Sequence, residues 1–224
     1  MRVVPEDDPR DPKLSVYGDA EHARAYATRW DSGRGRARDA RKQRALEASF
    51  EHLGAFGSVL DAPCGTGRMT KFLGTRGTYI GIDLAPAMLR EARARHADAR
   101  YVVGDLTRLP LADRSVDVAV CIRLMHLVRD PVLRVSFLRE LARVSRVGVV
   151  VDFRHDRALR TWFGRVRARL GLRARAHNAH ARETVAAELA QAGLVDPRFV
   201  AVRTPAALSD KMVVVARRAG PSAR

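Results

Sequence analysis

Three carboxylates and two glycines form the clearest chemical pattern in this sequence. Asp61, Asp83 and Asp105 each follow a short apolar run, and Gly65 and Gly67 stand in a turn directly after the first run. Glycine allows backbone conformations that are closed to residues with a Cβ atom, so such a turn can approach a ligand closely. A helix that follows the turn would present free N–H groups and a partial positive charge. Acids at the ends of three successive strands of one sheet predict a pocket for a nucleoside.

The details of the turn indicate which nucleoside. The G-x-G-x-x-G turn that holds the pyrophosphate of a dinucleotide has a third glycine, which is absent here. Asp61 lies four residues before Gly65, where a carboxylate would repel phosphate but accept hydrogen bonds from an ammonium group. Asp83 is placed to accept from both ribose hydroxyls, and Asp105 from an adenine amino group. A sugar, a base and a zwitterionic amino-acid tail together describe S-adenosylmethionine.

An alternation of strands and helices must position these side chains. From Val59 onward the pattern implies a parallel sheet with right-handed crossovers. The predicted strands span 58–62, 78–82, 100–104, 116–122, 147–153, 198–203 and 211–217. The predicted helices span 67–74, 86–96, 131–144, 157–170 and 181–192. Pro86 suits the first turn of its helix, and Gly193 suits a helix C-cap.

The N-terminal region has a different pattern. Residues 1–14 contain three prolines and lack periodicity, which favours a disordered or loosely docked tail. Between residues 19 and 53, apolar residues recur at helical spacing, but Ser32–Arg36 interrupts them, so we expect two helices that flank a basic loop. The length of 224 residues suits one α/β domain with a modest extension. We therefore expect an N-terminal tail and helical cap over residues 1–54 and a cofactor-binding domain over residues 55–218.

The composition favours a reduced, cytoplasmic protein. No apolar stretch approaches the ~18 residues that a membrane span needs, and the first residues lack the apolar segment of a secretory signal. Cys64 and Cys121 do not make a disulfide framework, and we expect both to be small buried apolar side chains near the cofactor. His177 and His180 are spaced like half of a metal-ligand set, but no second pair of Cys or His complements them. We expect no metal site and interpret the two histidines as part of a solvated polar loop.

The residues around the glycine turn resemble those of the class I (Rossmann-like) S-adenosylmethionine-dependent methyltransferases. The motif of that family usually reads D-x-G-C-G-x-G. This chain has the run Asp61-Ala62-Pro63-Cys64-Gly65-Thr66-Gly67, with proline in place of the first glycine. Asp83 and Asp105 match the family's ribose and adenine acids, and the run from Gly104 to Ala119 matches the usual approach to the fourth strand. The resemblance covers about residues 55–155 well.

This resemblance implies a fold, an activity and a cofactor. The fold is a doubly wound, mostly parallel α/β sheet of seven strands in the order 3-2-1-4-5-7-6, with the last strand antiparallel and helices on both faces. The activity is methyl transfer from S-adenosylmethionine, with an N-terminal helix that closes over the cofactor. The implied cofactor-binding residues are Asp61, Cys64, Gly65, Gly67, Arg68, Asp83, Leu84, Asp105, Leu106, Ile122, Tyr26 and Arg29. Arg29 or Arg68 is the expected partner of the methionine carboxylate, whereas Asp117, which begins the fourth strand, is assigned to structure.

Two histidines are the candidate catalytic residues. His126 follows the predicted fourth strand and His155 follows the fifth, so both would lie at the edge where the cofactor binds. Either imidazole could take a proton from a hydroxyl group near neutral pH. The alternative is that they shape the pocket without acting as a base.

Positive charge is the other conspicuous property. The chain has 41 basic and 25 acidic residues and a formal net charge of +16, which favours an anionic partner without specifying a reaction. One basic run spans residues 34–44, and another lies in the predicted amphipathic helix at 157–170. That helix either packs on the sheet or contacts anionic lipid or a phosphorylated substrate. Both runs would flank the acceptor side of the pocket.

Three functions remain open at this point. The favoured one is methyl transfer to an oxygen or nitrogen of a small-molecule or of a lipid- or glycan-linked acceptor. RNA methylation is the second, suggested by the charge. Against it, aromatic residues make up only 6% of the chain, and Ile122-Arg123-Leu124-Met125 stands where base-amine methyltransferases often carry an Asn/Asp-Pro-Pro-aromatic run. The third is a non-catalytic, cofactor-binding regulatory partner.

Overall fold

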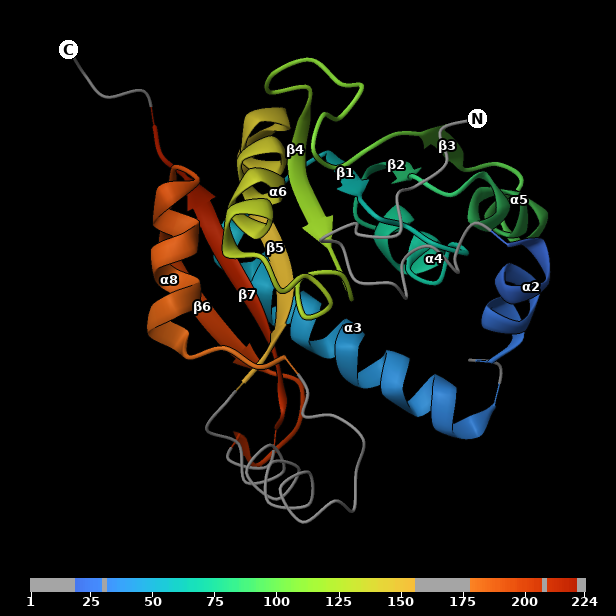
Figure 1. The fold of residues 1–224 in the computed structure, drawn as a ribbon, viewed down its shortest axis with the longest axis horizontal. Coiled ribbons are helices and arrows are strands. Elements are labelled where there is room, and N and C mark those ends of the chain that lie inside the picture. Colours follow the sequence, from blue (N-terminus) through green and yellow to red (C-terminus); the bar gives the residue numbers. More distant parts are fainter. Residues whose placement is uncertain (1–18, 30–31, 156–177, 207–208, 221–224) are drawn as a thin grey trace.

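A seven-stranded sheet forms the centre of the structure (Figure 1). The computed structural model describes residues 19–29, 32–155, 178–206 and 209–220. The strands are β1 (Ser58–Asp61), β2 (Thr78–Asp83), β3 (Arg100–Val103), β4 (Val116–Cys121), β5 (Ser145–Arg154), β6 (Leu194–Ala201) and β7 (Lys211–Arg218). Their order is β3-β2-β1-β4-β5-β7-β6, and β7 is antiparallel to both of its neighbours. The predicted fold class and strand order are therefore confirmed.

Helices cover both faces of this sheet. Helices α6 (Pro131–Val144) and α8 (Arg182–Gln191) pack on one face, and α3 (Gly33–Leu53), α4 (Thr70–Gly74) and α5 (Pro86–Arg95) pack on the other. Side chains alternate between the two cores along each strand, as a pleated strand requires: Val149 and Val151 of β5 face the first core and Val150 faces the second. The carboxyl ends of β4 and β5 point toward the lower edge of the sheet in Figure 1.

Helix α2 (Ala20–Thr28) is attached to this assembly through α5. Its Ala23 is fully buried and forms a small apolar cluster with Ala87 and Met88 of α5. Asp19 caps the helix by accepting a hydrogen bond from the backbone nitrogen of His22 at 3.0 Å. Docking on α5 places α2 beside the end of β2.

The prediction of a basic loop at Ser32–Arg36 is wrong. Gly33 to Arg36 form the first turn of α3, because the Ser32 hydroxyl caps the helix by accepting from the backbone nitrogen of Gly35 at 3.1 Å. The basic run at 34–44 therefore lies on a helix. Leu46, Phe50 and Leu53 of the same helix enter the second core, so α3 is part of the layer that covers the sheet.

Two other predicted boundaries move for local reasons. Helix α4 begins at Thr70 and not at residue 67, because Gly67 has a φ of +74° and lies outside the helical conformation. Strand β6 begins at Leu194, earlier than predicted, and its register with β7 shifts between Val195 and Arg198. The residue inside that irregularity, Asp196, has a φ of +50°, which obscures the alternating pattern.

Other expected helix ends are confirmed. Pro86 occupies the first turn of α5. Gly193 follows α8 with a φ of +76°, the left-handed conformation that commonly ends a helix. The predicted helix at 157–170, with its basic face, lies outside the described residues.

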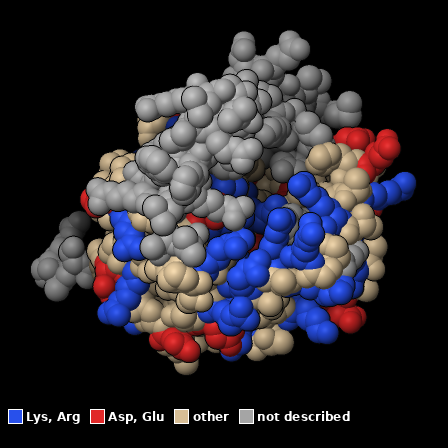
Figure 2. All heavy atoms as spheres, turned by 90° about the horizontal axis from the view of Figure 1, so that it is seen from below, with Lys and Arg blue, Asp and Glu red and all other residues tan. Residues whose placement is uncertain are grey.

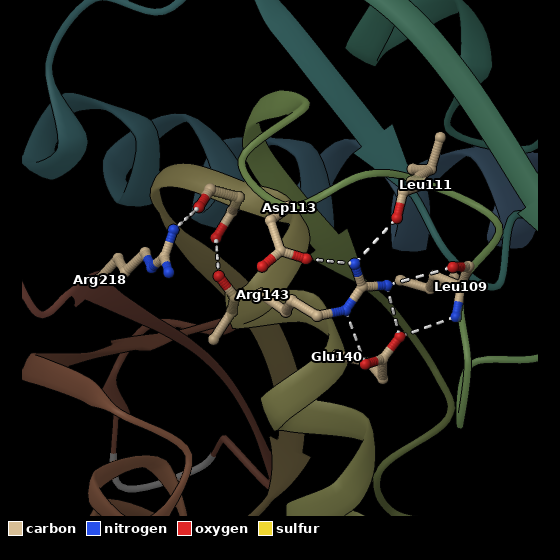
Figure 3. A network of polar contacts seen from close by, with 8 residues as sticks. Leu109, Leu111, Asp113, Glu140, Arg143 and Arg218 are labelled. Atoms are coloured by element: carbon tan, nitrogen blue, oxygen red, sulfur yellow. Dashed lines mark hydrogen bonds and ion pairs between the residues drawn. The ribbon is translucent and has the colours of Figure 1, made fainter.

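A single arginine at the end of α6 holds the connection between β3 and β4 (Figure 3). Arg143 donates to the carbonyl oxygens of Leu109 and Leu111, at 3.1 and 2.9 Å, and to the carboxylates of Asp113 and Glu140, at 2.7 and 2.8 Å. Glu140 in turn accepts from the backbone nitrogen of Leu109 at 2.8 Å. This network anchors the segment that begins at the predicted adenine-binding residues.

The opposite edge of the sheet confirms the structural role of Asp117. Its carboxylate accepts hydrogen bonds from the backbone nitrogens of Gly57 and Ser58, both at 2.9 Å, and from Arg146 at 2.7 Å. The Arg146 hydrogen bond is the main reason that the pKa of Asp117 falls to about 2. The residue thus fixes the start of β1 and β4, at the end of the sheet away from the site.

Within the described residues, none of the helices has the length and apolar composition that crossing a membrane would require.

Candidate active site

The site begins with a buried acid at the end of β1. Asp61 is 2% exposed and accepts one side-chain hydrogen bond, from the Tyr79 hydroxyl at 3.2 Å. Thr70 lies within hydrogen-bond distance of the Tyr79 and Tyr101 hydroxyls, at 3.0 and 2.9 Å. Burial raises the pKa of Asp61 to about 7, and the Tyr79 hydrogen bond offsets only part of that rise. This carboxyl group therefore sits in a position where a cation would stabilise its ionised form.

The glycine turn folds across the ends of β1 and β2. The backbone nitrogen of Cys64 donates to Ile82 O at 2.9 Å, and that of Gly65 donates to Asp83 Oδ2 at 2.8 Å. Gly65 has a φ of +56°, and a Cβ built on it would meet open space. Gly67 has a φ of +74°, and a Cβ there would lie 3.0 Å from the Tyr101 hydroxyl. The two glycines thus have different roles. Gly65 leaves open space in front of the turn, and Gly67 allows the turn to pack closely against the rest of the domain.

Asp83 and its neighbours line the end of β2. The second oxygen of Asp83 accepts from the backbone nitrogen of Ala85 at 2.9 Å. Burial raises the pKa of this carboxyl group, and the backbone hydrogen bonds oppose the rise. Leu84, which follows Asp83, is 49% exposed. Because each carboxylate oxygen has two lone pairs, Asp83 can hold the turn and still accept from hydroxyl groups.

The ends of β3 and β4 complete this side of the pocket. Asp105 follows β3 and accepts from the backbone nitrogen of Thr107 at 2.8 Å, a local turn that fixes its carboxylate. Leu106 is buried in the core under α6, and Ile122, directly after β4, is buried in the core under α3. The structure therefore brings the predicted residues of the first four strands to one edge of the sheet.

Helix α2 places Tyr26 over this edge. The guanidinium of Arg123, which follows β4, lies 5.5 Å from the centre of the Tyr26 ring. Burial raises the pKa of the Tyr26 hydroxyl, and the charges that act on it include Asp83 of β2 and Asp152 of β5. The charges at the ends of both strands therefore act on Tyr26. Arg29, at the end of the same helix, is exposed and close enough to influence Tyr26.

Arg68 has a different environment from the one predicted. Its guanidinium forms an ion pair with Asp39 of α3. The pair ties the glycine turn to α3, and a role toward a methionine carboxylate stays a prediction.

The residues present fit S-adenosylmethionine. Asp61 is buried, and its one side-chain donor among the described residues is the neutral Tyr79 hydroxyl, which suits binding of an ammonium group. The Thr66 hydroxyl, inside the glycine turn, is buried without a hydrogen-bond partner among the described residues, so the turn has unused polar capacity. The space in front of Gly65 is open.

Comparison with known proteins agrees with this geometry. Residues 59–148 match the family described as "Methyltransferase domain". Residues 59–148 therefore belong to a methyltransferase domain, and the strand order is that of the class I methyltransferase fold. The cofactor of this domain is S-adenosylmethionine, as the sequence predicted.

Two curated relatives cover part of this methyltransferase domain. The malonyl-[acyl-carrier protein] O-methyltransferase of Serratia marcescens is 36% identical over 112 residues, which are 50% of this chain and 42% of that protein. The demethylmenaquinone methyltransferase of Beutenbergia cavernae is 35% identical over 112 residues, 47% of this chain and 45% of that protein. The matched region thus spans less than half the length of each relative.

Solved structures resemble the methyltransferase domain in fold. The magnesium protoporphyrin IX methyltransferase of Synechocystis PCC 6803, with bound SAH, superposes with a TM-score of 0.66 at 14% identity and covers 95% of this chain and 100% of its own. Human N-acetylserotonin methyltransferase, in complex with SAM, gives a TM-score of 0.67 at 14% identity over 97% of this chain and 61% of its own.

The two candidate catalytic histidines of the methyltransferase domain differ in environment. His126 lies in the turn after β4, and burial lowers its pKa to about 4 despite the opposing effect of Asp152. The imidazole is therefore neutral at pH 7. His155 extends β5: its backbone nitrogen donates to Asp210 O at 3.0 Å and it pairs with His180 in an isolated bridge. A catalytic role of either residue stays a prediction.

The interpretation of His180 as part of a solvated loop is wrong. Its ring packs edge-on against Phe153 with 5.8 Å between ring centres, and its Nε2 atom is buried. His177 lies outside the described residues. In the part of the chain that the structure describes, no group of three or more His, Cys, Asp or Glu side chains could hold a metal ion.

Both cysteines are buried, as expected. Burial is the main cause that raises the pKa of the Cys64 and Cys121 thiols above their ordinary values. Neither thiol is therefore a nucleophile at neutral pH.

Sequence reasoning did not single out a set of buried charges beside the pocket. Lys42 of α3 donates to Asp152 of β5 at 2.6 Å, and Lys211 of β7 lies opposite Arg154 of β5. Seen from below the sheet, Lys and Arg side chains gather on this face (Figure 2). Asp152 could have indicated this set from the sequence, because it is an acid near the end of a predicted strand, as Asp61 and Asp83 are.

Proposed function

We propose that this chain transfers a methyl group from S-adenosylmethionine to an oxygen or nitrogen atom of a small-molecule or carrier-linked acceptor. The observation that carries the proposal is the pocket formed by Asp61, the glycine turn and Asp83 at one edge of the sheet. The names of the relatives support it, because both groups of curated relatives methylate small or carrier-linked acceptors. The bound cofactor would supply an electrophilic methyl group on a sulfonium sulfur.

The residues of the pocket have distinct proposed roles in holding this cofactor. Asp61 accepts from the ammonium group, and Asp83 accepts from the ribose hydroxyls while it stays bonded to Gly65. Asp105 accepts from the adenine amino group. Apolar contacts to the base come from the exposed side chain of Leu84, while Leu106 and Ile122 pack in the two cores beneath the site.

Tyr26 would close the pocket from the side of α2. Its ring is held under the Arg123 guanidinium, and the helix that carries it is docked on α5 next to Ala85. Exclusion of water by such a cover strengthens electrostatic interactions within the site. The proposed contribution of the protein is therefore positioning of the acceptor against the methyl group.

RNA is the less favoured acceptor. Aromatic residues, on which unpaired bases stack, make up only 6% of the chain. RNA binding would appear as a tight association that weakens steeply with salt.

Calorimetric titration with S-adenosylhomocysteine tests the cofactor site. We expect Asp61→Asn to weaken binding roughly 10- to 100-fold, which corresponds to the 1–3 kcal/mol lost when a charged hydrogen-bond partner is removed. Asp98→Asn is the matched control, because Asp98 is exposed in the turn before β3. Equal affinities of the folded Asp61→Asn variant and the wild type would contradict the assignment.

A transfer assay tests the activity. The full chain is incubated with methyl-labelled S-adenosylmethionine and malonyl-acyl-carrier protein, a demethylated quinone and a structured RNA. Label transferred to either of the first two supports the proposal. Tight cofactor binding with label transferred to RNA alone would overturn it.

A further inference from the structure

Four cations lie together beside the proposed acceptor side of the pocket. They are Lys42 on α3, Arg123 after β4, Arg154 at the end of β5 and Lys211 at the start of β7, and we call them the cation cluster. Two described carboxylates lie among them, Asp152 and Asp210.

The strand pattern explains why these charges share one face of the sheet. Val150 of β5 and Val213 of β7 face the core under α3. Because side chains alternate along a strand, residues 152 and 154 of β5 and residue 211 of β7 lie on that same face. Arg154 is the direct cross-strand partner of Lys211. The face of the sheet that is apolar under α3 therefore carries charged residues at the carboxyl edge, beside the cofactor pocket.

Three members of the cation cluster have partners of their own. The Nζ atom of Lys42 lies 2.6 Å from Asp152 Oδ2, Arg154 lies 3.2 Å from Asp210 Oδ2, and Arg123 lies over the Tyr26 ring. The other oxygen of Asp152 accepts from the backbone nitrogen of Arg123 at 2.6 Å. Asp152 and Asp210 are thus both paired with members of the cation cluster.

Lys211 has no counter-ion among the described residues. Its ammonium has neither a hydrogen bond nor an ion pair with a described residue. Burial lowers its pKa to about 8, Asp152 acts in the opposite direction, and Lys42, Arg154 and Arg123 lower it further by repulsion. An incoming anion would relieve this repulsion.

The cation cluster borders the cofactor pocket. The Arg123 guanidinium lies 5.5 Å from the centre of the Tyr26 ring, and the charges that act on the Tyr26 hydroxyl include Asp83 of the cofactor pocket and Asp152 within the cation cluster. The charges of Arg123, Arg154 and Lys211 lower the pKa of His126, which lies in the turn that follows β4. An acceptor bound at the cluster would therefore lie next to the methyl donor.

We propose that the cation cluster binds a carboxylate of the methyl acceptor and that the Lys211 ammonium forms the ion pair with it. This inference rests on the proposed function and names its substrate class. The Lys211 ammonium has no ion-pair partner among the described residues, and one carboxylate supplies the single negative charge that pairs with it. The malonyl group in the name of the Serratia relative is an acceptor that carries such a carboxylate.

Binding of a matched pair of small probes tests the proposal. The full chain is titrated by calorimetry at pH 7 with monomethyl malonate, with its neutral amide methyl malonamate and with inorganic phosphate, each in the presence and absence of S-adenosylhomocysteine. We expect monomethyl malonate to bind at least tenfold more tightly than either of the other probes.

Variants of Lys211 assign the contact. Lys211→Met should weaken monomethyl malonate binding at least tenfold, and Lys211→Arg should retain most of it. Lys71→Met is the control, because Lys71 lies on the exposed side of α4 and should leave the affinity unchanged. Circular dichroism checks that each variant is folded.

The outcomes separate this inference from the proposed function. Binding of S-adenosylhomocysteine together with equal affinities for the carboxylate and the amide would overturn the carboxylate site alone. Wild-type affinity of Lys211→Met for monomethyl malonate, or tighter binding of phosphate, would overturn it as well. A chain that binds monomethyl malonate through Lys211 but does not bind S-adenosylhomocysteine would contradict the proposed function and leave the anion site supported.

Discussion

The Nζ atom of Lys42 lies 2.6 Å from Asp152 Oδ2, and both side chains are more than nine-tenths buried. The pair connects α3 to the end of β5. Burial alone would raise the pKa of Asp152, but Lys42, His126 and the Arg123 backbone nitrogen lower it to about 2. The carboxylate is therefore ionised inside the protein and depends on its partners.

Removal of one member of this pair should destabilise the fold. Lys42→Met leaves an uncompensated buried carboxylate, and we expect the free energy of unfolding to fall by about 3–5 kcal/mol. Urea denaturation followed by circular dichroism measures it. Lys71→Met, on the surface of α4, should change it by less than about 0.5 kcal/mol. A loss below about 1 kcal/mol in Lys42→Met would mean that the two charges are not a coupled pair.

Cofactor binding should release protons through Asp61. Its pKa of about 7 in the folded protein means that near pH 7 about half of the molecules carry a proton on this carboxyl group. An ammonium group beside it would favour the ionised form and expel that proton. Titration with S-adenosylhomocysteine in two buffers of different ionisation enthalpy measures the release, and Asp61→Asn should abolish it. Identical heats in both buffers for the wild type would argue against an ammonium group at Asp61.

The same residue affects stability without ligand. The folded-state pKa of Asp61 lies above the ordinary value of 3.8, so the folded state binds more protons than the unfolded state between about pH 4 and 7. The contribution of Asp61 to stability should therefore decrease as the pH rises through that window. Comparison of wild type and Asp61→Asn by urea denaturation at pH 5 and 8 measures this difference, and a pH-independent difference would contradict it.

His126 should act in the opposite direction. Burial lowers its folded-state pKa to about 4, below the ordinary 6.5, so the unfolded state binds more protons between these values. Stability from this residue is present above about pH 6.5 and is lost as the pH falls toward 4. Thermal denaturation between pH 4 and 7 measures this effect. The melting temperature should fall less on acidification in His126→Gln than in the wild type. Parallel curves would indicate that the imidazole is solvated.

The two glycines Gly67 and Gly33 should respond differently to alanine. Gly67→Ala would place a Cβ 3.0 Å from the Tyr101 hydroxyl at a φ of +74°, so we expect a loss of about 1–3 kcal/mol in unfolding free energy and weaker cofactor binding. Gly33 starts α3 with open space around its Cβ position, so Gly33→Ala should be neutral or stabilising by up to about 1 kcal/mol. Chemical denaturation of the two variants makes the comparison. Equal effects would mean that the turn tolerates a side chain.

Local sequence was sufficient to predict that Asp61, the glycine turn and Asp83 meet at one edge of the sheet. Asp61, Gly65 and Asp83 lie within one strand-turn-helix-strand unit, where residue type and spacing determine the backbone geometry. The strand order followed from the family resemblance and is confirmed. The Ser32–Arg36 error arose because glycine and serine favour both loops and helix starts, and only the hydrogen bond from Gly35 to Ser32 distinguishes the two.

The acceptor side could not be predicted in this way. Lys42 and Asp152 are 110 positions apart, and Lys211 meets Arg154 only through the register of an antiparallel pair. Such contacts depend on tertiary packing and leave no local pattern. The sequence predicted that the basic run at 34–44, which contains Lys42, flanks the acceptor side of the pocket, but the pairing of Lys42 with Asp152 came from the structure.

Helix α3 has one further consequence. Asp39 pairs with Arg68 of the glycine turn, and Lys42, three positions later on the same helix, pairs with Asp152 at the cation cluster. One rigid turn of helix therefore contacts the walls of both proposed binding sites. A ligand that shifts either wall changes the energy of the other, and thermodynamic linkage makes the two effects equal in size. We expect the binding of donor and acceptor to be coupled, with each changing the affinity for the other by the same factor.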